Sequence, residues 1–257
     1  MDVNEIDITS AQECKKAIAE NVPEIVINAT GYTNVDACES SREECFAVNS
    51  EALKNLAMVC GDYSIKIIHF STDYVFDGMA IAPYKEDDNC NPLNVYGASK
   101  LAGERYLQEL AKNYLLIRTA WLYGAKGKNF VRTILEKSKT VKRLEVVDDQ
   151  VGSPTYTIDL AAAVSLLIDC NATGIFHITN RGFCSWYQFA VRILQEAGIA
   201  DVEVAAIKSD KLPRPARRPA YSVMSSKKFT DLTGKILKPW QLALQDYLKR
   251  TNVGKIR

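Results

Sequence analysis

The chain has 257 residues, of which 47% are hydrophobic and 25% charged, as in an ordinary soluble globular protein. Its 32 basic and 31 acidic side chains leave a formal net charge of +1, which gives no reason to expect a nucleic-acid or membrane surface. No apolar run approaches the roughly 20 residues that span a bilayer, and the polar N-terminus does not resemble a signal peptide. Seven cysteines without a C-x-x-C pair favour reduced thiols and a cytoplasmic location.

Strand and helix patterns alternate through the first half of the chain. Short apolar runs predict buried strands at 25–29, 65–70, 114–121 and 144–147. Amphipathic patterns predict helices at 9–20, 41–60, 95–112 and 129–137. Capping boxes are expected at Thr9/Gln12 and Ser41/Glu44. This alternation predicts parallel strands joined by right-handed helical crossovers, which is a doubly wound, Rossmann-like α/β sheet.

The second half of the chain predicts a smaller unit. Helices are expected at 159–168, 185–197 and 239–250, and a strand at 175–179. A Ser185/Gln188 capping box starts the second of these helices. Three prolines and three arginines within 211–222 predict an extended basic loop. We therefore expect an incomplete Rossmann-like dinucleotide-binding domain at 1–150 and a small mixed α/β substrate-binding lobe at 151–257, with an approximate boundary and some segments exchanged between the two.

One strand-helix unit carries residues suited to carbonyl chemistry. The strand at 65–70 runs into Thr72, and Tyr96 and Lys100 follow one turn apart on a helix. Ligands of doubly wound sheets bind beyond the C-terminal strand ends, where Thr72 must lie. When a nicotinamide reduces a carbonyl, a tyrosine whose pKa falls from about 10 towards neutrality can supply the proton, and a nearby ammonium lowers that pKa. A threonine hydroxyl can polarise the carbonyl. The spacing by itself is weak, because a Tyr-x-x-x-Lys pair is also common on a surface helix.

The surrounding sequence makes a family resemblance definite. The segments HFSTDYVFDG (69–78) and NPLNVYGASKLAGE (91–104) resemble the catalytic segment of dTDP-4-dehydrorhamnose reductases. Further segments resemble the same family in the same order, namely DITS (7–10), INATGYTNVDACE (27–39), AVNSEALKNLA (47–57), LIRTAWLYG (116–124), VVDDQVGSPTY (146–156), SWYQFA (185–190) and ARRPAYSV (216–223). The resemblance spans nearly the whole chain.

This resemblance implies an extended short-chain dehydrogenase/reductase. Its expected reaction is the reduction of the C4 keto group of dTDP-4-dehydro-L-rhamnose to dTDP-L-rhamnose, a step of nucleotide-sugar biosynthesis. The expected cofactor is NADPH or NADH, and the sequence leaves the choice open. The resemblance assigns Thr72, Tyr96 and Lys100 the catalytic roles described above.

The resemblance also implies which side chains line the ligands. Those expected at the cofactor, besides Tyr96 and Lys100, are Asp7, Ile8, Asn28, Ala29, Thr30, Gly31, Asn49 and Ser71. Those expected at the nucleotide sugar are Thr33, Val35, Asp73, Trp121, Asn129, Arg214 and Arg217. Asn49 resembles an asparagine that supports the lysine through a water. The arginines within 214–218 suit a diphosphate because their planar fork can bind two phosphate oxygens at once.

Several of these residues have a purely structural alternative. Trp121 could belong to the core, Thr33 and Asp73 could be turn and cap residues, and the arginine run could be a solvated loop. Both histidines lie inside apolar strands, so buried core histidines with satisfied hydrogen bonds are expected. No metal site is expected, because two histidines and isolated acidic pairs do not form a ligand set.

The sequence departs from the family in one respect. Family members open with a strand, a Gly-rich turn and a helix that seat the cofactor pyrophosphate, whereas the first glycine here is Gly31. By this comparison roughly 30–35 residues are missing, which would make 25–29 a sheet edge and weaken dinucleotide binding. Three explanations compete: a fragment of an ordinary reductase, a natural short form completed by a partner or a homodimer, and a binding protein without turnover.

Two rival functions also remain. One is a non-catalytic regulatory subunit that resembles the β subunit of methionine adenosyltransferase. The other is a nucleotide-sugar epimerase or dehydratase, which usually needs a longer substrate lobe. The expected partner in every enzyme reading is a nucleotide sugar.

Overall fold

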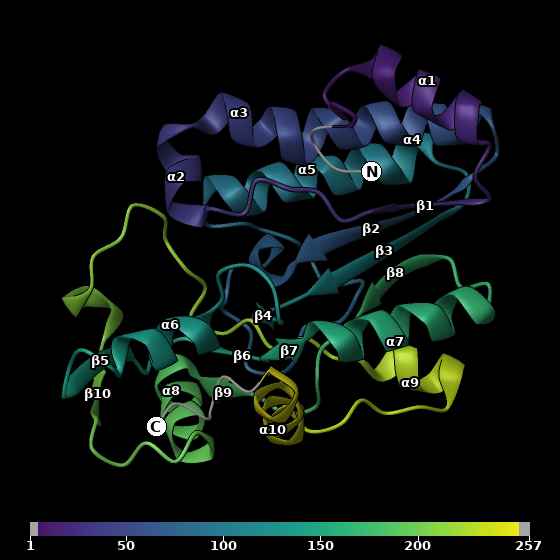
Figure 1. The fold of residues 1–257 in the computed structure, drawn as a ribbon. Coiled ribbons are helices and arrows are strands. Elements are labelled where there is room, and N and C mark those ends of the chain that lie inside the picture. The colour runs from purple at the N-terminus through teal and green to yellow at the C-terminus, as the bar shows by residue number, and fades with distance from the viewer. Residues whose placement is uncertain (1–4, 252–257) are drawn as a thin grey trace.

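A four-stranded parallel sheet forms the centre of the molecule (Figure 1). The computed structural model describes residues 5–251. The strand order is β1-β2-β3-β8, and every neighbouring pair is parallel. The strands are β1 (Ile25–Asn28), β2 (Lys66–Thr72), β3 (Tyr114–Thr119) and β8 (Gly174–His177). The doubly wound Rossmann-like sheet predicted from the sequence is therefore confirmed.

Helices cover both faces of this sheet, as Figure 1 shows. On one face lie α1 (Ala11–Asn21), α4 (Ala52–Asp62) and α5 (Val95–Leu110), with α2 (Val35–Ser40) and α3 (Arg42–Phe46) beside them. On the other face lie α7 (Thr157–Asp169) and α9 (Lys227–Thr233). Successive strand residues point to opposite faces, so Ile67 packs under α4 while Ile68 packs under α7. Each face thus has its own apolar core.

A smaller lobe adjoins the sheet. It contains a parallel strand pair, β5 (Arg143–Val147) with β10 (Glu203–Ile207), and three helices: α6 (Phe130–Lys137), α8 (Trp186–Glu196) and α10 (Trp240–Thr251). Short strands connect it to the sheet, namely β4 (Leu122–Tyr123), β6 (Val151–Gly152), β7 (Thr155–Tyr156) and β9 (Cys184–Ser185). Strand β8 comes from beyond residue 150 and β5 from before it, so each half of the sequence contributes to both regions. The division into two functional domains near residue 150 stays a prediction.

Three details differ from the sequence-based expectations. Helix α1 is capped by Ser10, which accepts the amide of Glu13, one residue later than the expected Thr9 box. The expected helix at 41–60 is interrupted by a π-helical turn at Ala47–Glu51, and Ser41 makes no side-chain cap. Strand β10 was not expected at all. The Ser185/Gln188 capping box is confirmed, with both of its hydrogen bonds present.

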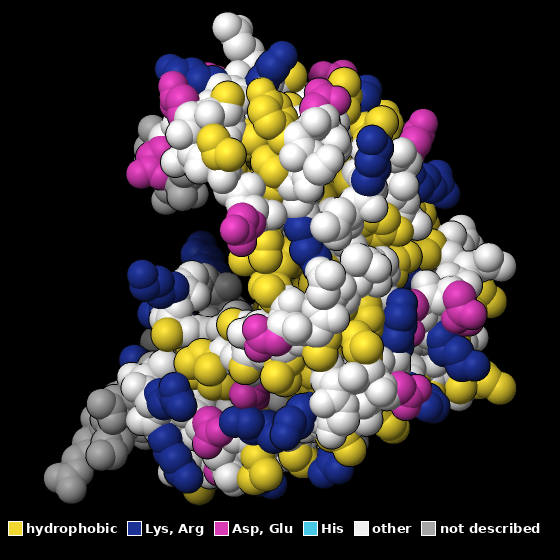
Figure 2. Space-filling model, turned by 90° about the vertical axis from the view of Figure 1, so that its right-hand side faces the viewer, with side chains coloured by type: hydrophobic (Ala, Val, Ile, Leu, Met, Phe, Trp, Pro, Cys, Tyr) yellow, Lys and Arg dark blue, Asp and Glu magenta, His cyan; other side chains and the backbone are white. Residues whose placement is uncertain are grey.

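The sheet ends at β1, as predicted. Within residues 5–251 β1 pairs only with β2, and Ile27 is 53% exposed. None of the helices in that range is long and apolar enough to cross a bilayer. On the face drawn in Figure 2, basic and acidic side chains are interspersed rather than gathered into a field of one sign, consistent with the near-zero net charge.

Candidate active site

The expected catalytic residues meet at the carboxyl end of β2. Thr72 ends the strand, and its buried hydroxyl accepts the amide of Tyr74 at 3.2 Å. Tyr96 lies in the first turn of α5, which Asn94 caps by accepting the amide of Gly97 at 2.8 Å. The Thr72 hydroxyl lies near the Tyr96 phenol and lowers its pKa. The two hydroxyl groups therefore lie together beyond the strand end.

Close backbone packing fixes this arrangement. A Cβ built on Gly97 would lie 2.1 Å from the carbonyl oxygen of Tyr74, far inside contact distance. Only glycine lets α5 approach the turn after β2 so closely. The rings of Tyr74 and Tyr96 then meet edge to face, with centroids 5.8 Å apart. The start of α5 and the end of β2 thus form one packed unit.

The pKa of Tyr96 moves opposite to the sequence-based expectation. Burial raises the pKa of this phenol, and the nearby Asp73 and Tyr74 raise it further, while the nearby Thr72 hydroxyl lowers it. The expected lowering towards neutrality is therefore wrong for this structure. A raised pKa keeps the phenol protonated at neutral pH, which is the form able to donate a proton.

Lys100 lies one turn after Tyr96 and is almost fully buried. Its ammonium donates to the carbonyl oxygen of Phe70 at 2.6 Å and lies 2.9 Å from Nε2 of His69. Burial lowers the pKa of Lys100 to about 8, and burial also lowers the pKa of His69, which keeps the imidazole neutral. The ammonium is thus held against β2, which explains why it does not offset the effect of burial on Tyr96.

Two other residues near the strand end have different surroundings. Ser71 donates its hydroxyl to Glu104, a buried carboxylate paired with Arg118 at 2.7 Å. The Ser71 hydroxyl, which is expected to contact the cofactor, thus donates instead to a buried ion pair. Asp73 is buried, and burial raises its pKa to about 6. Its Oδ1 accepts from Thr72, while Oδ2 has no hydrogen-bond partner among the described residues.

The expected cofactor loop follows β1. Asn28 is buried and accepts from the amide and the hydroxyl of Thr30, at 3.1 and 2.7 Å, while Ala29, Thr30 and Gly31 are exposed. Asn49, in the π-helical turn, holds the backbone of Tyr32 with two bonds of 2.8 and 3.0 Å and also donates to Ser99. A Cβ on Gly31 would lie 3.2 Å from Oδ1 of Asn49. This backbone is thus fixed beside the carboxyl ends of β1 and β2.

The outer residues of the expected site are more scattered. Asp7 is exposed, and its carboxylate accepts from the amide and hydroxyl of Thr9. Ile8 packs against the core beneath α1. Thr33 is exposed and Val35 half-buried at the start of α2. Thr33 and Val35 therefore lie in the segment that follows β1 and leads into α2. Asp7 and Ile8 lie in the segment just before α1.

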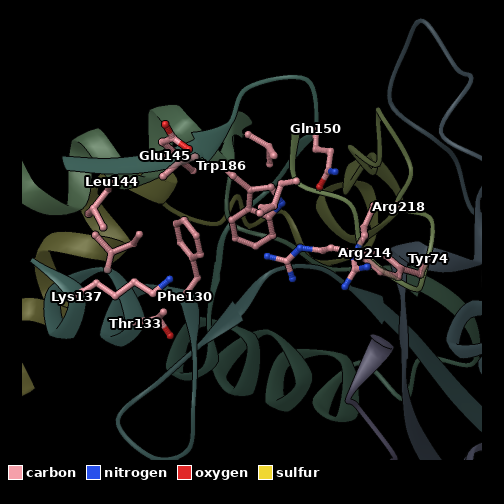
Figure 3. A pocket seen from close by; sticks show the side chains of 14 residues that line it. Tyr74, Phe130, Thr133, Lys137, Leu144, Glu145, Gln150, Trp186, Arg214 and Arg218 are labelled. Atoms are coloured by element: carbon pink, nitrogen blue, oxygen red, sulfur yellow. The ribbon is translucent and has the colours of Figure 1, made fainter. Parts of the chain in front are cut away.

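A pocket of about 460 Å³ is lined by Tyr74, two residues after Thr72, while Thr72 and Tyr96 themselves do not line it (Figure 3). Figure 3 shows Tyr74, Arg214 and Arg218 on one side, Phe130 and Trp186 in the middle, and Lys137 at the far end. Its lining comes from the turn after β2, from α6 and β5, from the start of α8 and from the loop after 211. Tyr74 lines the pocket and its ring also meets the ring of Tyr96, so this one side chain separates and links the pocket and the hydroxyl pair.

Trp121 and Asn129 have structural roles beside this pocket. Trp121 adopts a φ of 47° and stacks on Trp186 with ring centroids 3.5 Å apart. Asn129 caps α6 with its side chain. Its Oδ1 accepts from the backbone amide of Arg132, and its Nδ2 donates to the carbonyl oxygen of Gly124 at 3.0 Å. Trp121 therefore supports the aromatic wall, and Asn129 positions the helix that carries Phe130.

Of the three arginines within 214–218 that were expected at the diphosphate, two line the pocket. Arg214 lines the pocket and pairs with Asp36 at 3.5 Å. Arg217 is exposed, and its backbone carbonyl accepts from Asn94 at 2.7 Å. It is Arg218, not Arg217, that lines the pocket. The basic run in the sequence marked the loop, but it could not show which side chain turns inward.

Sequence reasoning also missed most of the pocket wall. The missed residues are Tyr74, Phe130, Thr133, Ile134, Lys137, Leu144, Glu145, Val146, Val147, Gln150, Trp186 and Leu212. Their only shared signal was their place in or beside segments with family resemblance. Among residues 5–251 no cluster of three or more potential metal ligands is present. His69 and His177 are buried inside β2 and β8, as predicted.

A doubly wound parallel sheet with hydroxyl and ammonium groups beyond its strand ends defines a Rossmann-like protein of the short-chain dehydrogenase/reductase class. Comparison with known families narrows this class. The chain belongs to the family described as the RmlD substrate binding domain, which matches residues 1–253.

Individual relatives agree with this assignment. The chain is 34% identical to dTDP-4-dehydrorhamnose reductase of Escherichia coli, over 96% of this chain and 87% of that protein. A crystal structure of a dTDP-4-dehydrorhamnose reductase from Clostridium acetobutylicum is 42% identical, with a TM-score of 0.95 over 98% of this chain and 89% of that one. The Bacillus anthracis reductase in complex with NADP is 36% identical, with a TM-score of 0.94 and the same coverage.

Proposed function

We propose that this protein reduces the C4 keto group of dTDP-4-dehydro-L-rhamnose with NADPH or NADH. The observation that carries the proposal is the position of Tyr74, which lines the pocket with Arg214 and Arg218 and packs its ring against Tyr96, the partner of Thr72. In a nucleotide sugar the diphosphate joins the sugar that carries the ketone to the nucleoside, and in this site Arg214 and Arg218 lie on the same side of the pocket as Tyr74, next to the hydroxyl pair.

In the proposed reaction the two hydroxyl groups act together. Thr72 and Tyr96 would donate to the ketone oxygen, and Tyr96 would pass its proton to the alkoxide that forms there. Burial keeps this phenol protonated at neutral pH, so the proton is present when the alkoxide forms. Thr72, held by the amide of Tyr74, would keep the ketone in place while the proton moves.

The residues near β1 and β2 fit a nicotinamide cofactor. The buried ammonium of Lys100 and the exposed backbone at Thr30 and Gly31 are donors suited to ribose hydroxyl groups, and Gly31 leaves space where a side chain would crowd Asn49. The cofactor, when bound, would supply the hydride for the ketone carbon. Lys100 would hold the ribose, as its position at the carboxyl end of the sheet allows.

The rest of the proposal concerns binding. Arg214 and Arg218 would hold the diphosphate, and Phe130 and Trp186 would contact the base. Intact Thr72, Tyr96 and Lys100 favour an enzyme over the regulatory alternative. A cytoplasmic location, and a homodimer or other partner that covers the edge at β1, stay predictions.

The test is turnover of dTDP-4-dehydro-L-rhamnose by the purified chain, followed as loss of NADPH or NADH absorbance. Tyr96→Phe should lower kcat by about 10²–10⁴-fold, because it removes the proton donor, and should leave dTDP affinity unchanged. Tyr63→Phe, at a tyrosine 46% exposed, is the matched control. An unchanged rate in Tyr96→Phe, or no turnover by the unaltered chain at saturating concentrations of either cofactor, would contradict the proposal.

A further inference from the structure

The carboxylate of Asp36 lies where the arginine loop meets the Rossmann-like part of the chain. It belongs to α2, whose start Asn34 caps, and it is 178 residues from Arg214 in the sequence. Its Oδ1 accepts from Nη1 of Arg218 at 2.5 Å and its Oδ2 from Nη2 at 2.8 Å. The amide of Ala216 also donates to Oδ1, at 3.2 Å. One carboxylate thus holds the loop through both a side chain and the backbone.

This contact leaves part of the Arg218 guanidinium available. A guanidinium has five N–H groups, and the bonds to Asp36 and to the carbonyl of Ala216 engage three of them. Arg218 also lies beside the side chain of Tyr74, where its charge offsets part of the rise that burial causes in the pKa of that phenol. Arg218 is only 11% exposed and lines the pocket, so its orientation there is set by Asp36 on one side and Tyr74 on the other.

We propose that Asp36 is a positioning residue for substrate binding: it fixes Arg218, and with it the loop at 214–218, in the orientation that receives the diphosphate of the nucleotide sugar. This inference rests on the proposed function and deepens it. Asp36 acts through Arg218 and does not itself touch the ligand, because its carboxylate and the diphosphate are both anions and would repel each other.

The electrostatic surroundings support the same role. Arg218 lowers the pKa of Asp36, so the carboxylate is ionised throughout the neutral range. The pair is half-buried, with the Asp36 side chain 30% exposed, and its two parallel bonds give it a defined geometry that a single contact to a lysine would lack. The chain of contacts continues from Arg218 through Tyr74 to the ring of Tyr96.

The decisive experiment is a double-mutant cycle on dTDP affinity, measured by calorimetry with the full chain. Asp36→Asn, nearly the same size but uncharged, should weaken dTDP binding by about tenfold, since it removes two charge-assisted bonds that orient Arg218. Asp36→Glu should restore most of the affinity. In an Arg218→Gln background Asp36→Asn should have a much smaller effect, because only the contacts of Asp36 with Arg214 and with the Ala216 amide are then left to lose. Asp231→Asn, which removes a carboxylate from an exposed pair with Lys227, is the matched control.

A second measurement needs no ligand. Hydrogen exchange of the segment 214–218 should become faster in Asp36→Asn than in the unaltered chain, whereas exchange at α9 should not change. Unchanged or tighter dTDP binding by Asp36→Asn, independent effects in the cycle, or unchanged exchange at 214–218 would overturn the role given to Asp36. Failure of the unaltered chain to bind dTDP would instead contradict the proposed function, and the exchange result would still decide whether Asp36 fixes the loop.

Discussion

The two ends of the proposed site are built in different ways. The end around Thr72, Tyr96 and Lys100 comes from one strand and the helix that follows it, and it is buried. The pocket wall comes from the turn after β2, from α6, β5 and α8, and from the loop after 211, and its charged groups remain partly in water. Buried groups change their pKa values, whereas half-exposed groups keep their charges and pair with each other.

This contrast has a chemical reason. Proton transfer to an alkoxide needs a donor whose protonation is controlled by its surroundings, and burial provides that control at Tyr96 and Lys100. Diphosphate binding needs permanent positive charge in a defined orientation. Asp36 and Tyr74 provide the orientation for Arg218 without removing it from the pocket.

The largest expected effect tests the burial of Lys100. Burial lowers the pKa of Lys100 to about 8, whereas an unfolded lysine titrates near 10.5. Between these values the unfolded state binds more protons, so this residue makes the protein more stable as pH rises from 8 to 10.5, by about 3 kcal/mol in total. In Lys100→Met this rise in the free energy of unfolding between pH 8 and 10.5 should be absent.

The measurement is urea unfolding of both proteins from pH 7 to 10.5. Cysteines and tyrosines titrate in the same range, but they are common to both proteins and cancel in the difference. Lys54→Met, at a half-exposed lysine, serves as the control and should change little. Parallel curves for the unaltered chain and Lys100→Met would mean that Lys100 is not desolvated in solution.

A smaller effect tests the packing that joins α5 to the end of β2. Gly97→Ala would place a Cβ against the carbonyl of Tyr74, so we expect it to lower the free energy of unfolding by about 1–3 kcal/mol and to lower kcat by displacing Tyr96. Thermal unfolding and turnover measure the two effects. Glu109→Ala, on the exposed side of the same helix, should change neither. If Gly97→Ala left kcat intact, the close approach would not determine the position of the phenol.

The catalytic end could be predicted because its chemistry is local in sequence. Tyr96 and Lys100 share a helix face by spacing alone, and apolar runs located β2 and α5 to within two residues. The pKa of Tyr96 could not be predicted in the same way. It depends on how deeply the phenol is packed and on the Lys100 ammonium turning to Phe70, which only the three-dimensional structure shows.

The pocket wall depends on contacts between distant segments. Arg217 and Arg218 are adjacent in sequence, and the turn of the loop against Asp36 decides which of them faces the pocket. Likewise, β10 lies about 60 residues from β5, its partner, and its sequence has no strong alternation. The interruption in the helix at 41–60 places Asn49 against the backbone of Tyr32, a contact that no local pattern reveals.

The smallest expected effect tests the orientation of the substrate within the pocket. Lys137 lines the pocket at the α6 end, away from the two arginines, and it is exposed (Figure 3). Because exposed charges are screened by salt and contribute at most about 1 kcal/mol, Lys137→Ala should weaken dTDP binding by only about twofold at physiological ionic strength. Calorimetry at two salt concentrations measures this, with Lys139→Ala as the control. A tenfold loss would instead place the diphosphate at the α6 end, and the arginines would then face the sugar.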